Sequence, residues 1–367
     1  MSLSHIPHQK MWNYKCRAIQ KKLGLLPMMM SEKVFTLRHR IDMFISAFKN
    51  NQTLSIIILS VILLAVWLPG IGNPSPLTYN NTMPLYEFYA RAVNNVPYIH
   101  NSLALILIIL ESVMLNYILN KFEIMAKKTV MPAIFYCLLM SCCKPLIHFY
   151  PLIFTNFFIL IALLKIGHSY RMDEAFTTIF DASFFIAMAS LFYFPAIIIY
   201  PLIWVALIVI RPFVWREWII SMIGLMLPYF FTFVFYFWFD KVNFLLFDKI
   251  FFPSSDALLS LSGQRETFLV ISAILLLLSV LSVLTLAKGW PVNTILSRNF
   301  LVVLFWLFGL SILSFSMAPV FSITYLSIAS IPLAVFVANF FLMTKYKKTA
   351  ELLFILFLAG ILLEIYS

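Results

Sequence analysis

The sequence contains few charged residues. Asp, Glu, Lys and Arg make up 11% of its 367 residues, whereas a soluble globular domain carries about 25%. Hydrophobic residues make up 62%, and the mean hydropathy is +0.96. The chain has too few charged residues to cover a surface exposed to water. This excludes a water-soluble protein and predicts that most of the chain is embedded in lipid.

Glycine and cysteine are scarce too. The 9 glycines form neither a GxxxG helix-packing motif nor a phosphate-binding loop. The four cysteines, Cys16, Cys137, Cys142 and Cys143, include no CxxC pair, so the sequence predicts neither a disulfide framework nor a zinc site. For the adjacent pair Cys142-Cys143, packing at a helix interface is favoured, and oxidation is the alternative.

The six histidines are spread along the chain. Three lie in the first 50 residues, and His100, His148 and His168 follow at wide intervals. Iron in a membrane oxygenase needs several histidine or carboxylate ligands that converge on one point. This scatter disfavours a carotenoid-cleaving oxygenase, and we expect no metal and no other cofactor.

Long apolar runs are what the sequence has in abundance, from Thr53 to its last residue. A helix of about 20 apolar residues crosses the roughly 30 Å hydrocarbon core of a bilayer, so we predict an all-α, polytopic transmembrane helix bundle of about eleven spans. Three short runs, near 130–143, 179–194 and 195–210, favour tilted hairpins or re-entrant segments. The other predicted spans lie near 53–71, 101–120, 147–165, 217–239, 267–287, 299–317, 320–342 and 349–365.

The basic residues predict the orientation. With the N-terminus inside, 21 of the 26 Lys and Arg residues fall on the cytoplasmic side, where such residues concentrate in membrane proteins. An odd number of spans then places the C-terminus outside. The net charge of +11 indicates attraction to anionic lipid headgroups, at about 1 kcal/mol per basic residue near the surface, and no nucleic-acid partner. The basic residues predicted on the outer side are Arg91, Lys144, Lys241, Lys249 and Arg265.

The chain divides into two parts by composition. Residues 1–50 form a basic tail, and residues 51–367 form the transmembrane domain, with longer outer loops near 72–100 and 240–266. The tail lacks the signature of a signal peptide, because no small-residue cleavage site follows the first apolar run. It is either a cytoplasmic or interfacial segment, or a stretch upstream of the true start codon, since further methionines follow Met1.

Glu111 lies midway along the predicted span at 101–120. A carboxylate at the centre of a transmembrane helix costs about 2.5–3.5 kcal/mol to insert. One hypothesis is a proton or substrate site. The other, which we favour, is a protonated or hydrogen-bonded glutamate that ties helices together, because the sequence shows no second buried acid or base for a relay.

The outer loop near 72–100 contains a short amphipathic segment. Tyr86, Tyr89 and Val93 recur at helical spacing, which predicts a short helix with aromatic anchors at the outer surface of the membrane. Glu87 and Arg91 are four residues apart on that helix. Such a pair is most often a surface ion pair worth about 0.2–0.5 kcal/mol, and the alternative is a catalytic Glu87.

The outer loop near 240–266 mixes charged residues with Phe and Leu, a composition typical of a lid on the outer leaflet. Its Arg265 joins Arg91 and Lys144 on the predicted outer side, and such cations bind phosphate groups. We therefore predict that Arg91, Lys144 and Arg265 hold a substrate phosphate. A solvated loop is the alternative.

Three segments, Asp181–Pro195, Arg211–Trp218 and Gly224–Tyr229, resemble an uncharacterised family of polytopic inner-membrane proteins of Bacteroidota, a domain of unknown function. With the first span and its outer loop, the similarity covers most of the chain from about Met43 onward. The resemblance implies a multi-pass protein of the bacterial inner (cytoplasmic) membrane. It implies no activity, because none is established for that family.

The layout of spans and loops also resembles the C-type glycosyltransferases, which use polyprenyl-phosphate sugars. In that superfamily an acidic residue on an interfacial helix follows the first span, and short hairpins and a long outer loop come later. Glu87–Ala92 stands at the position of that acidic motif, so the resemblance implies that Glu87 is the base toward an acceptor hydroxyl. The paired acidic residues usual in the superfamily are reduced here to Glu87 alone.

Together these features predict an integral inner-membrane protein of the cell envelope that binds a lipid-linked, polyprenyl-phosphate substrate at its outer face. Its expected partners are membrane lipids, polyprenyl phosphate and other envelope proteins. The main alternative is a non-catalytic membrane subunit of an envelope or secretion complex. A transporter centred on Glu111 is less favoured, because the sequence has no inverted repeats.

Overall fold

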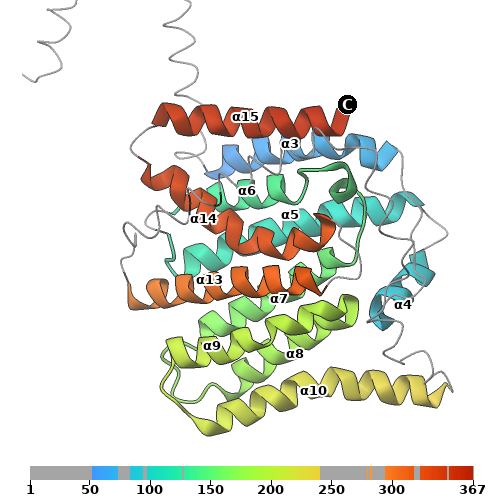
Figure 1. The fold of residues 1–367 in the computed structure, drawn as a ribbon, viewed down its shortest axis with the longest axis vertical. Helices are drawn as coiled ribbons and strands as arrows, with labels where there is room; N and C mark the ends of the chain where they lie inside the picture. Colours follow the sequence, from blue (N-terminus) through green and yellow to red (C-terminus); the bar gives the residue numbers. More distant parts are fainter. Residues whose placement is uncertain are drawn as a thin grey trace, which may run out of the picture. The chain divides into compact units, whose positions relative to one another are not determined.

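The computed structural model divides the chain into two compact units, Met1–Ser46 and Ala47–Ser367. Everything described below belongs to the second unit, whose elements are coloured in Figure 1. The predicted tail, the loop near 240–266 and nearly all of the predicted span near 267–287 lie outside the described residues. The described residues are 52–72, 83–93, 97–125, 128–239, 279, 282, 294–317, 323–344 and 347–366.

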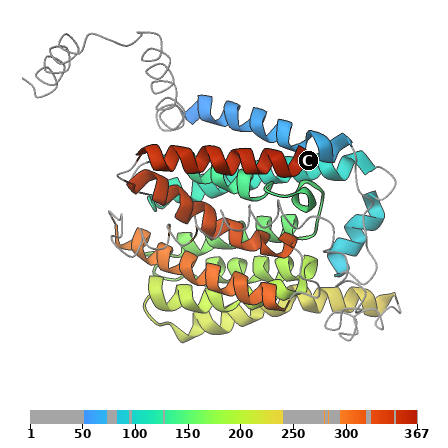
Figure 2. The ribbon, with the colours of Figure 1, turned by 45° about the horizontal axis from the view of Figure 1, so that its top comes forward.

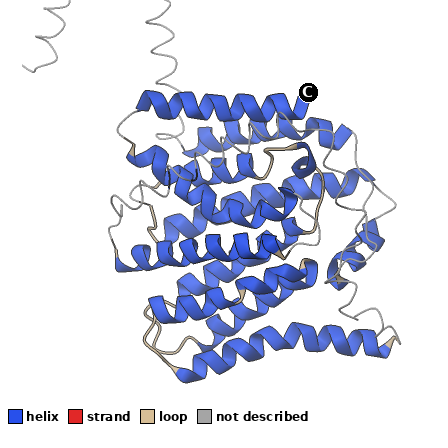
Figure 3. Cartoon of the chain, in the orientation of Figure 1, coloured by secondary structure: helices blue, strands red, loops and turns tan. Residues whose placement is uncertain are grey.

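Every element in these ranges is a helix, and none of the described residues forms a strand (Figure 3). The predicted all-α class is therefore confirmed for this part of the chain. The helices are α3 (Gln52–Gly72), α4 (Pro84–Val93), α5 (Pro97–Lys121), α6 (Met131–Leu139), η1 (Lys144–Ile147), α7 (Leu152–His168), α8 (Phe176–Phe192), η2 (Phe194–Ile199), α9 (Pro201–Ile210), α10 (Trp215–Trp238), α13 (Ile295–Ser316), η5 (Ile323–Ala329), α14 (Ser330–Met343) and α15 (Lys347–Tyr366).

Four stretches of the described chain are helical, long and apolar enough to cross a membrane. They are Ile99–Lys121, Trp215–Trp238, Ile295–Ser316 and Thr324–Met343, with mean hydropathies between 1.9 and 2.2. Helices also occupy the other predicted spans that the structure describes, among them α3 with 21 residues and α15 with 20. The shortest α-helix is α6, whose nine residues reach only about 14 Å, less than half of the hydrocarbon core, at the helical rise of about 1.5 Å per residue.

The helices lie side by side as a bundle (Figures 1 and 2), with α15 and α3 at one edge and α10 at the opposite edge. In the middle, α8 packs against both α7 and α10, and α14 packs against α6. Burial follows this order. Of the most apolar window of each helix, 78% is buried for Thr324–Met343 but only 17% for Trp215–Trp238, because α10 contacts mainly one neighbour.

The bundle has two ends with different polar residues. The end that holds α4 also holds the last residues of α3 and α15 (Figure 1), and we refer to it as the α4 end. The opposite end holds the last residues of α5, α7 and α9 and the first residues of α10. We refer to it as the basic end, because it carries Lys121, Lys165, Arg211 and Arg216.

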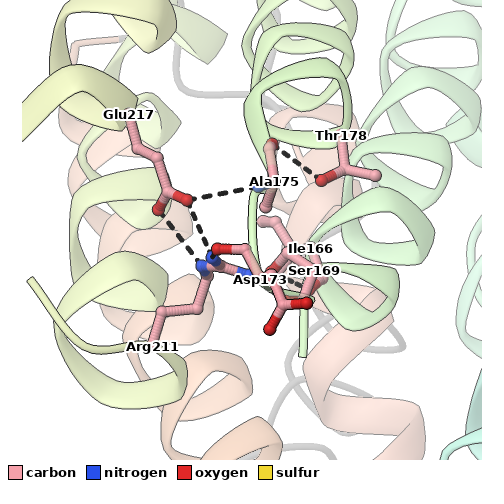
Figure 4. A network of polar contacts seen from close by, with 7 residues as sticks. All are labelled: Ile166, Ser169, Asp173, Ala175, Thr178, Arg211 and Glu217. Atoms are coloured by element: carbon pink, nitrogen blue, oxygen red, sulfur yellow. Dashed lines mark hydrogen bonds and ion pairs between the residues drawn. The ribbon is translucent and has the colours of Figure 1, made fainter. Parts of the chain in front are cut away.

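At the basic end, a buried ion pair joins the connectors on either side of the hairpin formed by α8 and α9 (Figure 4). Arg211 Nη2 lies 2.8 Å from Glu217 Oε1, and the side chains are only 2% and 1% exposed. Arg211 also donates to the carbonyl oxygen of Ser169, and Glu217 accepts from the backbone N–H of Ala175. Buried charges of this kind are stable only when both partners are hydrogen-bonded, as they are here.

Candidate functional site

The α4 end contains a cluster of aromatic and ionisable side chains centred on α4 and Phe149. The helix α4 begins at Pro84 and carries Glu87 in its first turn and Arg91 in its last. This order suits a helix. Proline is favoured at the first position, and a negative charge near the start and a positive charge near the end interact favourably with the helix dipole. The predicted short helix in this loop is therefore confirmed.

The inward face of α4 differs from the prediction for Tyr86 and Tyr89, the two tyrosines predicted as membrane-surface anchors. Tyr86, predicted as an anchor at the membrane surface, is only 3% exposed and packs into the bundle. Phe88 points outward instead and is 71% exposed. The helical spacing was right, but spacing alone does not say which of several apolar faces turns toward the protein.

Phe149 is the ring on which the cluster is built. The ring of Tyr89 stacks on it with centroids 4.8 Å apart, and Tyr86 lies nearly parallel to it at 6.2 Å. The imidazole of His100 approaches its edge at 6.4 Å. Phe154 continues the cluster, because its ring meets those of both Phe149 and Tyr89 edge-on.

Asn101 holds Phe149 in place. Its side-chain oxygen Oδ1 accepts from the backbone N–H of Phe149 at 2.9 Å, and its Nδ2 donates to the carbonyl oxygen of Gly70 at 2.6 Å. Gly70 lies so close to the backbone of Ile147 that a Cβ at this position collides with the Ile147 carbonyl oxygen. One buried amide thus joins the end of α3 to the loop before α7.

Glu87 is buried but only partly bonded. Its side chain is 8% exposed, and Oε1 forms an ion pair with Arg91, whose own side chain is 61% exposed. Its other oxygen, Oε2, is buried and has no hydrogen-bond partner among the described residues. Buried carboxylate oxygens are normally hydrogen-bonded, so a lone oxygen is a common mark of a site that receives a ligand, a proton or water.

Two further buried polar atoms of the cluster lack a hydrogen-bond partner within the described ranges. They are the hydroxyl of Tyr89 and Nδ1 of His148. Burial raises the pKa of Tyr89 to about 12, and burial with the nearby Tyr89 and Tyr325 does the same for the pKa of Tyr86. Burial, with His100 close by, lowers the pKa of His148. Near pH 7 the cluster therefore has neutral tyrosines and a neutral His148.

The predicted phosphate-binding residues are found in different surroundings. Arg91 lies at the surface beside Glu87, as the spacing of four residues predicts. Lys144 begins η1, is partly exposed, and forms no ion pair within the described part of the chain. Arg265 lies outside the described residues. The structure thus brings Glu87 and Arg91 together and leaves the predicted convergence of all three cations a prediction.

Glu111 lies away from this cluster, in the interior between α5 and α6. It is fully buried, and the hydroxyl of Tyr136 donates to its Oε2 at 2.8 Å. The hydrogen bond to a second helix that we favoured for Glu111 is therefore present. The adjacent Ser112 lines a crevice of about 50 Å³ between α3, α5 and α6.

The sequence pointed to Glu87 but missed the residues around it. His100 was considered only as a metal ligand, and Asn101 was not singled out at all. The described residues contain no group of three or more His, Cys, Asp or Glu that could hold a metal ion. The one sequence feature that could have pointed to Asn101 is its position as a polar residue at the start of an apolar run.

No family model, no curated protein and no solved structure matches this chain. The likenesses to the Bacteroidota family and to the C-type glycosyltransferases therefore stay predictions from the sequence.

Proposed function

We propose that this is a multi-pass protein of the bacterial inner membrane, with about eleven spans and a cytoplasmic N-terminus, that binds a polyprenyl-phosphate-linked substrate at its α4 end. In this proposal the α4 end faces outward, and the protein serves cell-envelope assembly. The apolar helices and the position of the basic residues at the opposite end support this orientation.

The observation that carries the proposal is the state of Glu87. One oxygen of a buried carboxylate faces an exposed guanidinium, and the other has no partner among the described residues. A general base needs an oxygen free to accept a proton, and a phosphate needs a cation that it can reach from solvent. Glu87 supplies the free oxygen and Arg91 the accessible cation, on adjacent turns of one short helix.

In the enzymatic form of the proposal, Glu87 Oε2 takes the proton of an acceptor hydroxyl. The acceptor oxygen forms the new bond to the anomeric carbon of the sugar. The bond from that carbon to the phosphate oxygen breaks, and the lipid phosphate leaves with the electron pair. Arg91 and Lys144 stabilise the negative charge on the departing phosphate.

The test is binding of a polyprenyl phosphate to the purified protein in phosphatidylcholine nanodiscs. Charge-assisted contacts to phosphate contribute roughly 1.5–3 kcal/mol each. The double variant Arg91→Gln/Lys144→Gln is therefore expected to bind more weakly by roughly a hundredfold or more. Glu87→Gln keeps the cations and is expected to retain binding while losing any transfer reaction.

The control is the double variant Lys128→Gln/Arg298→Gln. It removes the same charge from two exposed positions at or near the basic end, and binding is expected to stay within about twofold of the parent protein. Absence of saturable binding, or equal losses in the two double variants, contradicts the proposal.

One observation favours the alternative of a membrane subunit. The helix α10 is the least covered of the long helices, and its exposed side chains include Phe230, Phe231 and Phe237. A contiguous aromatic face of this kind suits packing against another membrane protein as well as lipid. A stoichiometric partner released by substitutions on α10, in a protein that binds no polyprenyl phosphate, supports the subunit.

A further inference from the structure

The basic end contains a lysine whose charge is held in a fixed position without a carboxylate partner among the described residues. Lys121 is the last residue of α5, and its ammonium nitrogen lies 2.5 Å from Nε2 of His168 at the end of α7. The same nitrogen lies 3.2 Å from the hydroxyl of Tyr117. We propose that Lys121, with Tyr117 and His168, binds the phosphate headgroup of an anionic membrane lipid.

Close packing of two helix ends sets this geometry. Phe122 follows Lys121 and lies directly on Gly167, where any Cβ collides with its ring. The same ring meets His168 edge-on at 5.6 Å and stacks on Phe300 at 5.8 Å. Because Gly167 admits the ring, the end of α5 reaches the end of α7, and Lys121 reaches His168.

The contacts of Lys121 leave its charge unneutralised. A histidine that accepts a hydrogen bond from an ammonium group is itself neutral, and so is a tyrosine hydroxyl. These two neighbours satisfy two of the three N–H donors, and no other hydrogen-bond acceptor in the described part of the chain takes the third, which can donate to an anion. Lys165, one helix away, forms instead an ion pair with Asp181 at 2.7 Å.

Carboxylates do not compete for Lys121 in the described part of the chain. Glu123, which follows it by two residues, forms no ion pair with it, although both side chains are exposed. The dipoles at the ends of α5 and α7 favour a cation at this position. Among the described residues, no carbonyl oxygen at these helix ends lies within hydrogen-bond distance of the ammonium group.

A stripe of exposed apolar side chains leads along α5 to Lys121. Ile106, Leu110, Val113 and Tyr117 follow one another at steps of three and four residues, so they share one face of the helix, and each is 44–59% exposed. The next step of four is Lys121. An acyl chain beside this stripe brings its headgroup to the ammonium group, which is why a lipid fits better than a free phosphate ion.

Other cations at the same end also lie over aromatic rings, as Lys121 lies over the ring of Tyr117. Arg171 lies over the ring of Tyr170 at 5.1 Å and Arg216 over the ring of Trp215 at 5.9 Å. Neither forms an ion pair with a described carboxylate. Aromatic rings beside lysine and arginine are typical of the membrane surface, where each cation strengthens binding to anionic lipid about fivefold.

The test measures retention of single lipids by native mass spectrometry, with phosphatidylglycerol and phosphatidylcholine added to the delipidated full-length protein. Lys121→Gln is expected to weaken phosphatidylglycerol binding about fivefold and to leave phosphatidylcholine binding unchanged. His168→Leu, which removes the acceptor that fixes the ammonium group, is expected to weaken it to a smaller extent. Thermal unfolding establishes that each variant is folded.

Lys128→Gln is the matched control, because Lys128 is an exposed lysine of the next connector and loses the same charge. It is expected to leave phosphatidylglycerol binding within twofold. Equal losses for Lys121→Gln and Lys128→Gln overturn the proposal, since they reduce the effect to net charge. Competition by soluble glycerol 3-phosphate as strong as that by the lipid overturns the assignment to a lipid. Binding of polyprenyl phosphate at the α4 end is unaffected by either result.

Discussion

The two ends of the bundle each contain a buried glutamate paired with an arginine, and the pairs differ in completeness. At the basic end, Glu217 and Arg211 are both buried, and both carboxylate oxygens of Glu217 have partners. At the α4 end, Glu87 is buried, Arg91 is exposed, and one carboxylate oxygen has no partner among the described residues. The two ends thus carry ion pairs of the same residue types that differ in the burial of the arginine and in the bonding of the glutamate.

This difference separates a structural ion pair from a functional one. A fully bonded, buried network fixes the connectors around it and has no group left to react. A buried carboxylate with one open oxygen beside an exposed cation costs stability, and such groups are concentrated where proteins bind or transform ligands. The comparison assigns Arg211 and Glu217 to the scaffold and Glu87 and Arg91 to the site.

The largest expected effect comes from breaking the complete pair. Glu217→Leu leaves the guanidinium of Arg211 buried without a counter-charge, which destabilises proteins by about 3–5 kcal/mol. Unfolding in mild detergent, followed by heat or denaturant, measures the loss. The double variant Arg211→Met/Glu217→Leu is expected to recover part of it, because no lone charge remains, although the backbone groups of Ser169 and Ala175 lose their partners.

The matched change at the other end is Glu87→Gln. Its partner Arg91 is exposed, so the pair contributes less than about 1 kcal/mol and the unfolding midpoint should hardly move. A loss as large as that of Glu217→Leu contradicts the assignment of Glu87 to the site and makes it part of the scaffold.

Much of the helical layout could be predicted from apolar runs alone. A helix lies at each predicted span that the structure describes, and the spacing of Glu87 and Arg91 gave their ion pair. These features depend on residues close together in the chain. The end of α6 at Leu139 is an exception, because the apolar run continues to Cys143 while the helix does not.

The surroundings of the site depend on contacts that no local pattern contains. Asn101 bonds to Gly70 and Phe149, which are 31 and 48 residues away. The helical spacing of α4 does not say whether its aromatic face turns toward the protein or toward the lipid, so the burial of Tyr86 could not be predicted. The same reason hid the partner of Glu111, since Tyr136 is one of 16 tyrosines.

A medium effect is expected from Asn101, whose substitution disturbs the α4 end without touching a charge. Asn101→Leu removes two hydrogen bonds worth about 0.5–1.5 kcal/mol each, so the stability should fall by roughly 1–3 kcal/mol. Because Phe149 loses its anchor, the platform under Tyr89 also shifts. Polyprenyl phosphate binding should therefore weaken in Asn101→Leu and stay intact in Glu217→Leu protein that is kept folded at low temperature.

A small effect is also expected for Glu111, a buried glutamate in the interior that forms no ion pair with a described arginine. Its bond to Tyr136 crosses from α5 to α6, and hydrogen bonds between membrane helices contribute on average about 0.6 kcal/mol. Glu111→Gln keeps an acceptor for the tyrosine and should leave both the unfolding midpoint and ligand binding unchanged. Glu111→Leu leaves the Tyr136 hydroxyl without its partner and should lower stability by about 0.5–1 kcal/mol. Should a well-folded Glu111→Gln protein lose all function, Glu111 belongs with Glu87 as a working carboxylate rather than with Glu217, and proton coupling replaces the structural assignment.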